Sequence, residues 1–581
     1  MNTDNNKAWF LILYLLSVAL QCWLMLRYPL FADEAFYWLE GQHLAWSYAE
    51  VPGWTPWLAW FSTFLPDGSF FVRLPHSLAA WLIPWAGIAI SRRLLPQVSA
   101  WQTGLMLLSL PLLMLTGILA IPDIWLILIS LLCILTTVLA IQTGNSRYFL
   151  WLGLCVAIGI NIHIRFWLLL FVATIVTLFF FRHDKPFIRR CLSLTLPMAL
   201  IGLVPVLLFN FDHEFPLLQF QLKDRHPWSF QIQHLIFFPL QILLITPLVF
   251  ILMLRIMKTG FQHQQPLIRW ALVIAVAHWL LYALLGFFAD GLRFNLHWGL
   301  ISYTLILTLT CVLHARSGWI LLTALSGWLV SLAGGLLLMH WQQQPMAGSL
   351  LEKRITEHAS GWQQLAKHTE NLLQPGQTLI ADQFITASQL AYALNKPKDI
   401  RVLPHPANNK HGRQQQIEIM GLHYTSDTTD GLVVIEQSAL KLEQQAEYYQ
   451  QMCALTGGLK LIGHMEIRGI KKYDFFNIEA GACDVPTLFY LDVKDDMVSG
   501  WVITDKETFD NLNLVVNVTE QPIANLQPMR LQETPFLRSL QPQRYNMLGF
   551  KIPRSNFDDN ALFRLCINKK DKTIELSPVF F

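Results

Sequence analysis

Charged residues are scarce in this sequence. They make up 14% of its 581 residues, whereas hydrophobic residues make up 54%; a soluble domain typically carries about 25% charged residues. The shortage is concentrated before Trp341, where apolar runs recur that are long enough to cross a bilayer. After Trp341 the sequence turns polar. A wholly soluble protein is therefore excluded, and the net charge of +3 is too small to predict nucleic acid as a partner.

Several motifs for common chemistries are also missing. The sequence has no CxxC or HExxH motif, so a structural metal site is not expected; a divalent metal is possible, but no motif indicates one, and no cofactor is predicted. It has no P-loop, nucleophile elbow or dinucleotide motif. Of eight cysteines, five lie in apolar runs. The other three are Cys453, Cys483 and Cys566, and their spacing does not say whether any two form a disulfide.

The apolar runs predict a bundle of about eleven transmembrane helices. The first run is not followed by a small-residue cleavage site, so it is expected to be a retained helix rather than a signal peptide. The predicted spans are 9–27, 74–91, 101–120, 124–141, 148–162, 166–181, 191–209, 232–254, 268–288, 297–313 and 318–339.

The loops between these spans fall into two sets. One set is short, basic and almost free of acids, which is typical of cytoplasmic loops; its cations are Lys7, Arg92, Arg93, Arg147, Arg182, Lys185, Arg189, Arg190, Arg255, Lys258, Arg269 and Arg316. The other set mixes both charge signs with aromatic residues and must face the opposite side: 28–73, 121–123, 161–165, 210–231 and 289–296. The N-terminus is then cytoplasmic, and an odd number of helices places the C-terminal part outside.

The first outer loop carries two adjacent acids in an aromatic, helix-favouring stretch, Phe31–Trp38. Asp33 and Tyr37 are four residues apart, so they share a face of a helix. One interpretation of Asp33 and Glu34 is a helix at the membrane interface with two solvated acids. The functional interpretation is a catalytic carboxylate held in a cleft.

A third acid, Asp123, follows a proline. Pro-Asp is a common helix start, in which the carboxylate caps free backbone N–H groups. A capping Asp can also face a cleft, so the two interpretations are compatible.

Several cations lie on the same outer side as these acids. An Arg near a helix end often only reaches toward the interface. That explanation accounts less well for cations that converge with acids on one face, because charges inside a membrane protein usually pair and mark function. The cations are Arg165, Lys223, Arg225, Arg293 and His297. Arg and Lys together suit a phosphate. A lipid-borne phosphate is therefore the expected ligand, and a carboxylate opposite it is suited to remove a proton from an acceptor hydroxyl.

Five motifs in the membrane half resemble those of a known family, and they occur in its order. They are Asp33-Glu34-Ala35-Phe36-Tyr37-Trp38, Phe71-Val72-Arg73-Leu74-Pro75, Ile121-Pro122-Asp123, the stretch Pro205–Arg225, and Asn295-Leu296-His297-Trp298. The chain is similar to bacterial members of the dolichyl-phosphate-mannose protein mannosyltransferase-like group of GT-C glycosyltransferases. That group includes the lipid A aminoarabinose transferases.

The resemblance implies an inverting transfer of a sugar from a polyprenyl (undecaprenyl) phosphate to an acceptor at the periplasmic face of the bacterial inner membrane. It implies that Asp33 is the leading catalytic residue, with Glu34 beside it and Asp123 in support. Tyr37, Arg73 and the outer-face cations are expected to bind the donor phosphate or substrate. The sequence also departs from the family. A proline pair after the first motif is represented only by Val51–Pro56, and a Lys often found between the fifth and sixth helices is replaced by Arg165.

The polar C-terminal part divides in two by pattern. Residues 345–484 mix helical spacing with short apolar runs, which favours an α/β domain. From residue 485 onward strands dominate, with turn residues between them, which favours a β-sandwich-like module. The expected organisation is therefore a GT-C membrane domain over 1–344, a periplasmic α/β domain over 345–484 and a β-module over 485–581.

The expected function is glycosyl transfer with lipid A or another envelope glycolipid as acceptor, and with a protein hydroxyl as the alternative acceptor. A lipid or solute transporter is the alternative from a different class. Transporters usually place polar sites near the midplane in two related halves, whereas here the charges gather at one surface and residues 1–170 and 171–340 show no repeat. A sensor with a membrane anchor needs one or two helices, not eleven.

Overall fold

The structure is a computed structural model that describes residues 3–225, 228–288, 296–313, 317–344, 350–410, 412–440 and 442–484, and then strands within 488–494, 497–504, 512–516, 519–522, 546–553, 563–569 and 572–575. The chain forms two compact units. Unit 1 comprises Met1–Trp362, Ser388–Lys398 and His405–Leu422; unit 2 comprises Gln363–Ala387, Asp399–Pro404 and His423–Phe581. The domain boundaries expected at residues 344 and 484 stay predictions.

Unit 1 is a helical bundle. Within the described residues, six helices are long and apolar enough to cross a membrane: α1 (Thr3–Arg27), α4 (Ser69–Leu94), α7 (Pro122–Thr143), α9 (Ile164–Phe181), α16 (Pro266–Gly286) and α18 (Ser317–Gln343). Their buried faces, among them Phe10, Ile83 and Ile127, form one continuous apolar core. The prediction of a multi-pass helical membrane domain is confirmed.

Other predicted spans are bent or short. The helices over Lys185–Ile201 meet α12 (Leu203–Asp212) at 43°, and those over Ile232–Ile245 meet α15 (Pro247–Gln262) at 103°. If each bent pair is one span, the described part of the chain holds up to eight. The remaining predicted spans are covered by shorter helices, α5 (Trp101–Leu108), α6 (Pro111–Thr116), α8 (Ser146–Ile160) and α17 (Leu300–Thr308). Proline begins α6 and α15, and a proline lacks the N–H that would continue the preceding helix. By the length and composition of the helices, the described part of the chain therefore has fewer membrane spans than the eleven that the sequence predicts.

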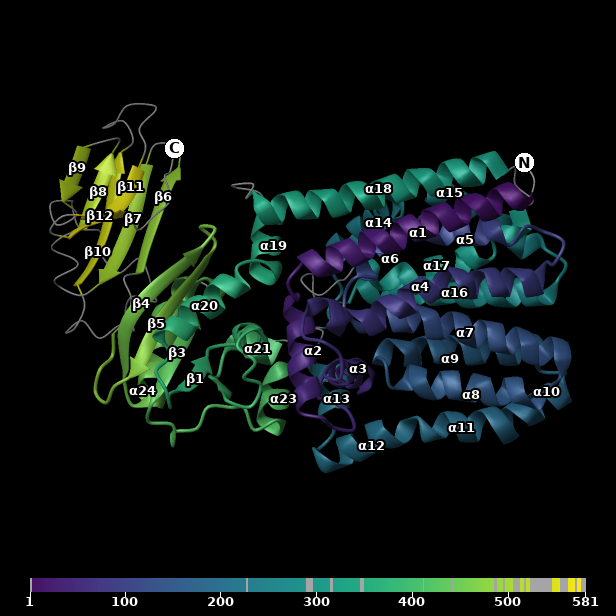
Figure 1. Cartoon of the computed structure of the whole chain (residues 1–581), viewed down its shortest axis with the longest axis horizontal. Coiled ribbons are helices and arrows are strands. Elements are labelled where there is room, and N and C mark those ends of the chain that lie inside the picture. The colour runs from purple at the N-terminus through teal and green to yellow at the C-terminus, as the bar shows by residue number, and fades with distance from the viewer. Residues whose placement is uncertain are drawn as a thin grey trace. The chain divides into compact units, whose positions relative to one another are not determined.

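Short helices gather at one end of the bundle. Figure 1 shows α2 (Ala32–Gln42), α3 (Trp54–Ser62), α13 (Pro216–Gln219) and α23 (Arg413–Ile419) at the end opposite to the N-terminus and to α10 (Lys185–Arg190). Helices α2 and α3 approach closely because residue 41 is glycine: a Cβ there would lie 2.7 Å from the backbone O of Pro56. The described parts of the two sets of loops that differ in charge thus lie at opposite ends of the bundle.

Unit 2 contains a five-stranded mixed sheet in the order β2-β1-β3-β5-β4. Strands β1 (Thr378–Ala381), β2 (Ile400–Val402) and β3 (Gly431–Glu436) are parallel, and β5 (Lys471–Ile478) and β4 (Leu459–Ile467) are antiparallel to their neighbours. Helix α20 (Trp362–Leu372) precedes β1, α21 (Phe384–Ala393) connects β1 to β2, and α24 (Leu442–Thr456) lies between β3 and β4. An α/β region is therefore present where the sequence predicted one.

The last part of the chain forms two antiparallel sheets. One has the order β10-β7-β6 and the other β12-β11-β8-β9. Their strands are β6 (Leu488–Lys494), β7 (Met497–Thr504), β8 (Leu512–Val516), β9 (Thr519–Pro522), β10 (Asn546–Pro553), β11 (Phe563–Lys569) and β12 (Lys572–Glu575). The β-rich character of this part is confirmed.

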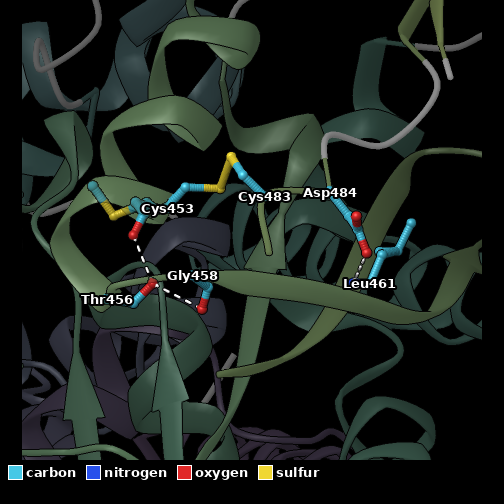
Figure 2. The surroundings of a disulfide bond; sticks show 7 residues. Cys453, Thr456, Gly458, Leu461, Cys483 and Asp484 are labelled. Carbon is cyan, nitrogen blue, oxygen red and sulfur yellow. Dashed lines mark hydrogen bonds between the residues drawn. A yellow bond between two sulfur atoms is a disulfide. The ribbon is translucent and has the colours of Figure 1, made fainter. Parts of the chain in front are cut away.

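A disulfide joins Cys453 in α24 to Cys483 (Figure 2). The segment that carries Cys483 is also tied to the start of β4, because Leu459 donates its N–H to the Ala482 carbonyl and Leu461 donates its N–H to the Asp484 carboxylate. The disulfide therefore fastens α24 to the segment that follows β5. The sequence alone did not select this pair.

We expect the Cys453→Ser, Cys483→Ser double variant to be less stable in unit 2. A bond that closes a loop with a sequence separation of 30 raises the free energy of unfolding by about 3–4 kcal/mol. Limited proteolysis of the full chain and its unfolding temperature measure the loss, with Cys566→Ser as the control. Peptide mapping without reductant should yield the Cys453–Cys483 cross-link. A cross-link that contains Cys566 would contradict the assignment.

Candidate active site

A fully buried ion pair joins Glu34 of α2 to Arg73 of α4. The Arg73 Nε donates to Glu34 Oε1 at 2.8 Å and its Nη2 to Oε2 at 2.5 Å, with side chains only 0–1% exposed. The carboxylate also accepts from the backbone N–H groups of Phe31 and Ala120. The guanidinium also donates to the carbonyls of Tyr28 and Pro29. Both side chains of the pair thus form their hydrogen bonds within the protein, which favours a structural role for Glu34 and Arg73.

Asp33, the neighbour of Glu34, points to a different partner. Successive helical residues point about 100° apart, and the Asp33 carboxylate is 44% exposed where that of Glu34 is buried. Asp33 Oδ1 lies 3.2 Å from Nη2 of Arg413 in α23. The Nη1 of Arg413 donates to the buried carboxylate of Glu50. We call Asp33, Glu50 and Arg413 the Arg413 group.

Aromatic side chains of α2 surround the guanidinium of Arg413. It lies 4.4 Å from the ring centroid of Phe36 and 5.3 Å from that of Tyr37, a favourable arrangement of a cation over aromatic faces. Tyr37 is buried, and this burial raises the pKa of its hydroxyl to about 12, with Arg413 lowering it and Asp33 raising it. Tyr37 therefore stays neutral and shapes the surroundings of Arg413.

A second group of charges lies at the starts of two long helices. Arg165 in the first turn of α9 binds the Asp123 carboxylate through two bonds, Nη1–Oδ1 at 2.8 Å and Nη2–Oδ2 at 3.1 Å. His297 Nε2 lies 3.3 Å from the same Oδ1. We call Asp123, Arg165 and His297 the Arg165 group. The capping role expected for Asp123 is wrong: Ile121 is the N-cap of α7, without a side-chain cap hydrogen bond, and the Asp123 carboxylate instead binds Arg165 and lies beside His297.

Arg225 lies between these two groups. Its Nη1 donates to the side chain of Gln221 at 2.6 Å, and Gln221 in turn donates to the backbone carbonyl of Glu50. Its guanidinium lies 5.8 Å from the ring centroid of Trp298, the neighbour of His297. Asp33, Arg165 and Arg225 all act electrostatically on His297. Five of the acids and cations predicted from the loops therefore meet in one region: Asp33, Asp123, Arg165, Arg225 and His297.

Two predicted residues do not join these contacts. Lys223 is exposed in the π-helical turn Phe220–Asp224 and takes part in none of the ion pairs described above. Arg293 lies outside the described residues. Among the residues that are described, no three His, Cys, Asp or Glu side chains are placed to hold a metal ion together.

Two residues of the Arg413 group escaped the sequence-based prediction. Glu50 stands just before Val51–Pro56, the stretch already noted as the family's altered proline pair, so its position could have drawn notice. Arg413 lies 380 residues from Asp33 in the polar half of the chain. No local pattern around Arg413 marks it as a site residue.

We expect loss of either partner of the buried Glu34–Arg73 pair to destabilise unit 1. Glu34→Gln and Arg73→Met each leave the other charge buried without its counterion, which costs about 3–5 kcal/mol. Thermal unfolding of the purified protein in detergent, followed by tryptophan fluorescence, measures the loss. Asp67→Asn, which changes an exposed acid, is the matched control. The double variant should lose less than the sum of the single variants, and an unaltered Glu34→Gln would contradict this role.

Comparisons with known proteins give one family match. Residues 50–209 match the model of the family described as dolichyl-phosphate-mannose-protein mannosyltransferase. This range contains Glu50, Arg73, Asp123 and Arg165, and begins after Asp33. No curated protein sequence matches the chain significantly.

Two crystal structures share the fold. ArnT from Cupriavidus metallidurans in the apo state has a TM-score of 0.61 and 14% sequence identity, covering 82% of this chain and 98% of that one. The same protein bound to undecaprenyl phosphate has a TM-score of 0.60 and 13% identity, covering 82% of this chain and 99% of that one. The resemblance of this chain to the dolichyl-phosphate-mannose protein mannosyltransferase family, predicted from its motifs, is therefore confirmed over residues 50–209, and the fold is like that of ArnT.

Proposed function

We propose that the protein is an inverting glycosyltransferase that moves a sugar from a polyprenyl phosphate, undecaprenyl phosphate in bacteria, to an acceptor hydroxyl. One observation carries the proposal: the half-exposed Asp33 carboxylate lies against Arg413 and within electrostatic range of the Arg165 group. An accessible acid beside several cations suits a reaction that takes a proton from one substrate and releases a phosphate from the other. The matched family model and the undecaprenyl phosphate bound by the structurally similar ArnT support this substrate class.

Asp33 is the base in this proposal. Of the three acids singled out in the sequence, its carboxylate is the most accessible: 44% exposed, against 0% for Glu34 and 9% for Asp123. Glu34 accepts four hydrogen bonds, and Asp123 is held by Arg165. Glu34 therefore anchors the first turn of α2, which also carries Asp33, and Asp123 orients Arg165.

The donor phosphate is assigned to the Arg165 group and Arg225. Both Nη atoms of Arg165 donate hydrogen bonds to Asp123, but its Nε is buried and has no hydrogen-bond partner among the described residues. His297 is 27% exposed, so a ligand can reach it. Tyr37 stays neutral and forms a wall of the site rather than a phosphate contact. Lys223 and Arg293, both predicted to bind the donor, remain candidates without a described contact.

The proposed step is a single displacement. Asp33 takes the proton of the acceptor hydroxyl as its oxygen attacks the anomeric carbon. The bond from that carbon to the phosphate oxygen breaks, and the polyprenyl phosphate leaves with the electron pair. The leaving phosphate gains one negative charge, which nearby cations stabilise. One displacement at the anomeric carbon inverts its configuration.

The site is proposed to face the periplasm of the bacterial inner membrane. The described basic loops, among them the one that carries α10, are typical of the cytoplasmic side and lie at the end of unit 1 opposite to α2 and α3 (Figure 1). The Cys453–Cys483 disulfide of unit 2 supports the same orientation, since disulfides persist in oxidising compartments such as the periplasm. The N-terminus is then cytoplasmic, and unit 2 is periplasmic.

We expect Asp33→Asn to lower the rate of sugar transfer by about 10²- to 10⁴-fold, the usual contribution of a general base. Because Asn keeps the size and polarity of Asp, the variant should unfold at the wild-type temperature. Transfer in membranes and the unfolding temperature are measured together, with Asp67→Asn as the control. A folded Asp33→Asn protein that transfers sugar at the wild-type rate would refute the assignment.

Lipid A or another envelope glycolipid is the proposed acceptor, with a protein hydroxyl as the alternative. We expect a deletion strain to lack one discrete sugar mass in the mass spectrum of its lipid A or envelope lipids. Complementation with the wild-type chain should restore that mass, and complementation with Asp33→Asn should not. Unchanged lipids together with loss of a sugar from a protein would select the alternative acceptor.

A further inference from the structure

Glu40 is a buried acid that the proposed reaction does not use. It follows Asp33 and Tyr37 on α2 at spacings of seven and three residues, which places all three on one side of the helix. Its side chain is fully buried, and neither carboxyl oxygen has a hydrogen-bond partner in the described part of the chain. Leaving an ionised carboxylate in such surroundings is costly, so an acid held there keeps its proton or acquires a counterion.

The cation that acts on Glu40 is Arg413, which is already shared. Its Nη1 binds the buried Glu50 carboxylate, and its Nη2 lies 3.2 Å from the half-exposed Asp33. An ionised Glu40 would compete for this guanidinium. The contact with Asp33 is the one that would be given up, because Asp33 can be solvated by water and Glu50 cannot.

We infer that Glu40 holds a proton in the working enzyme and that its loss at alkaline pH draws Arg413 away from Asp33 and slows the reaction. Glu40 is then a positioning residue that acts through Arg413. This part of the inference rests on the proposed sugar transfer. The protonation of Glu40 itself does not.

The neighbours of Glu40 leave it free to titrate near neutral pH. The charged and titratable groups that act on it or respond to it are Arg413 of α23, Asp33 and Tyr37 of α2, and Tyr48 of the following loop. Burial raises the pKa of Glu40 to about 8, with Arg413 lowering it and Asp33 raising it. Burial also raises the pKa of Tyr37 to about 12 and that of Tyr48 well above its ordinary value. The two tyrosines therefore keep their protons where Glu40 loses its own.

Stability gives a test that needs no substrate. The ordinary pKa of this carboxyl is 4.5 and its folded value about 8, so between these pH values the unfolded chain releases a proton that the folded chain keeps. Wild-type stability should fall as the pH rises from 5 to 8 relative to the Glu40→Gln variant, whose amide does not titrate. The difference should then stay constant above pH 8. Parallel unfolding temperatures for the two proteins from pH 5 to 9 would show that Glu40 holds no proton and would overturn the inference.

Transfer in native membrane vesicles, which supply their own carrier lipid and acceptor, tests the effect on the reaction. The wild-type rate should fall by about 10-fold from pH 7 to pH 9, as expected for one group of pKa near 8 that must be protonated. Glu40→Gln, which mimics the protonated acid, should keep its pH 7 rate to within about 2-fold at pH 9. Glu40→Leu, also uncharged, serves as a second variant should the amide disturb folding, and Asp67→Asn should retain the wild-type fall.

A 10-fold alkaline fall that persists in both Glu40 variants would overturn the gating role. Vesicles in which the wild-type chain transfers no sugar at any pH would instead overturn the proposed function. In that case the stability profile still decides whether Glu40 is protonated.

Discussion

The buried pair of Glu34 and Arg73 is the constraint on which the site depends. Removing two charges from water is expensive, and the cost is offset only when the charges meet each other and further hydrogen-bonding groups. Here the carboxylate receives four hydrogen bonds, and the guanidinium adds two carbonyl acceptors from the segment before α2. These bonds join α2, α4 and the segment at Ala120 in one arrangement. Asp33 is the residue before Glu34, and Asp123 follows Ala120 by three positions, so the same pair places both acids.

The adjacent acids of α2 have different surroundings because a helix turns about 100° per residue. Glu34 faces the bundle, where its carboxylate is held by the ion pair with Arg73, whereas Asp33 faces Arg413 and water. A sequence motif with two neighbouring carboxylates therefore contains one rigid anchor and one accessible group. A general base must be held in a fixed position, because the position of its carboxylate relative to the reacting proton sets the efficiency of proton transfer. The anchored Glu34 next to Asp33 meets this requirement.

Local patterns in the sequence predict many of the helices, strands and charged site residues, but not which residues contact one another. The apolar run Thr378–Ala381 coincides with β1, and loop charge placed Asp123 and Arg165 on the same side of the membrane, where they form a bidentate pair. The pairing of Glu34 with Arg73, 39 residues away, depends on how α2 packs on α4, which no local pattern encodes. The apolar runs predict about eleven spans, but hydropathy does not register the break at Leu110–Pro111 or the 103° bend before Pro247.

Arg413 shows why sequence order is a poor guide to the limits of this site. It belongs to the polar half of the chain, yet Ser388–Lys398 and His405–Leu422 are part of unit 1 rather than of the sheet. The side chain of Gln389 donates to the Leu30 carbonyl, that of Gln416 accepts from the Ala49 N–H, and the ring of Tyr392 lies 5.0 Å from that of Trp38. These contacts hold α2 and the segments on either side of it, and the Glu34–Arg73 pair holds the start of the same helix against α4. A membrane domain cut at residue 344 would keep Asp33 but lose the guanidinium beside it. These two segments of the polar half therefore belong to the same compact unit as the helical bundle, and the second of them supplies Arg413 to the candidate site.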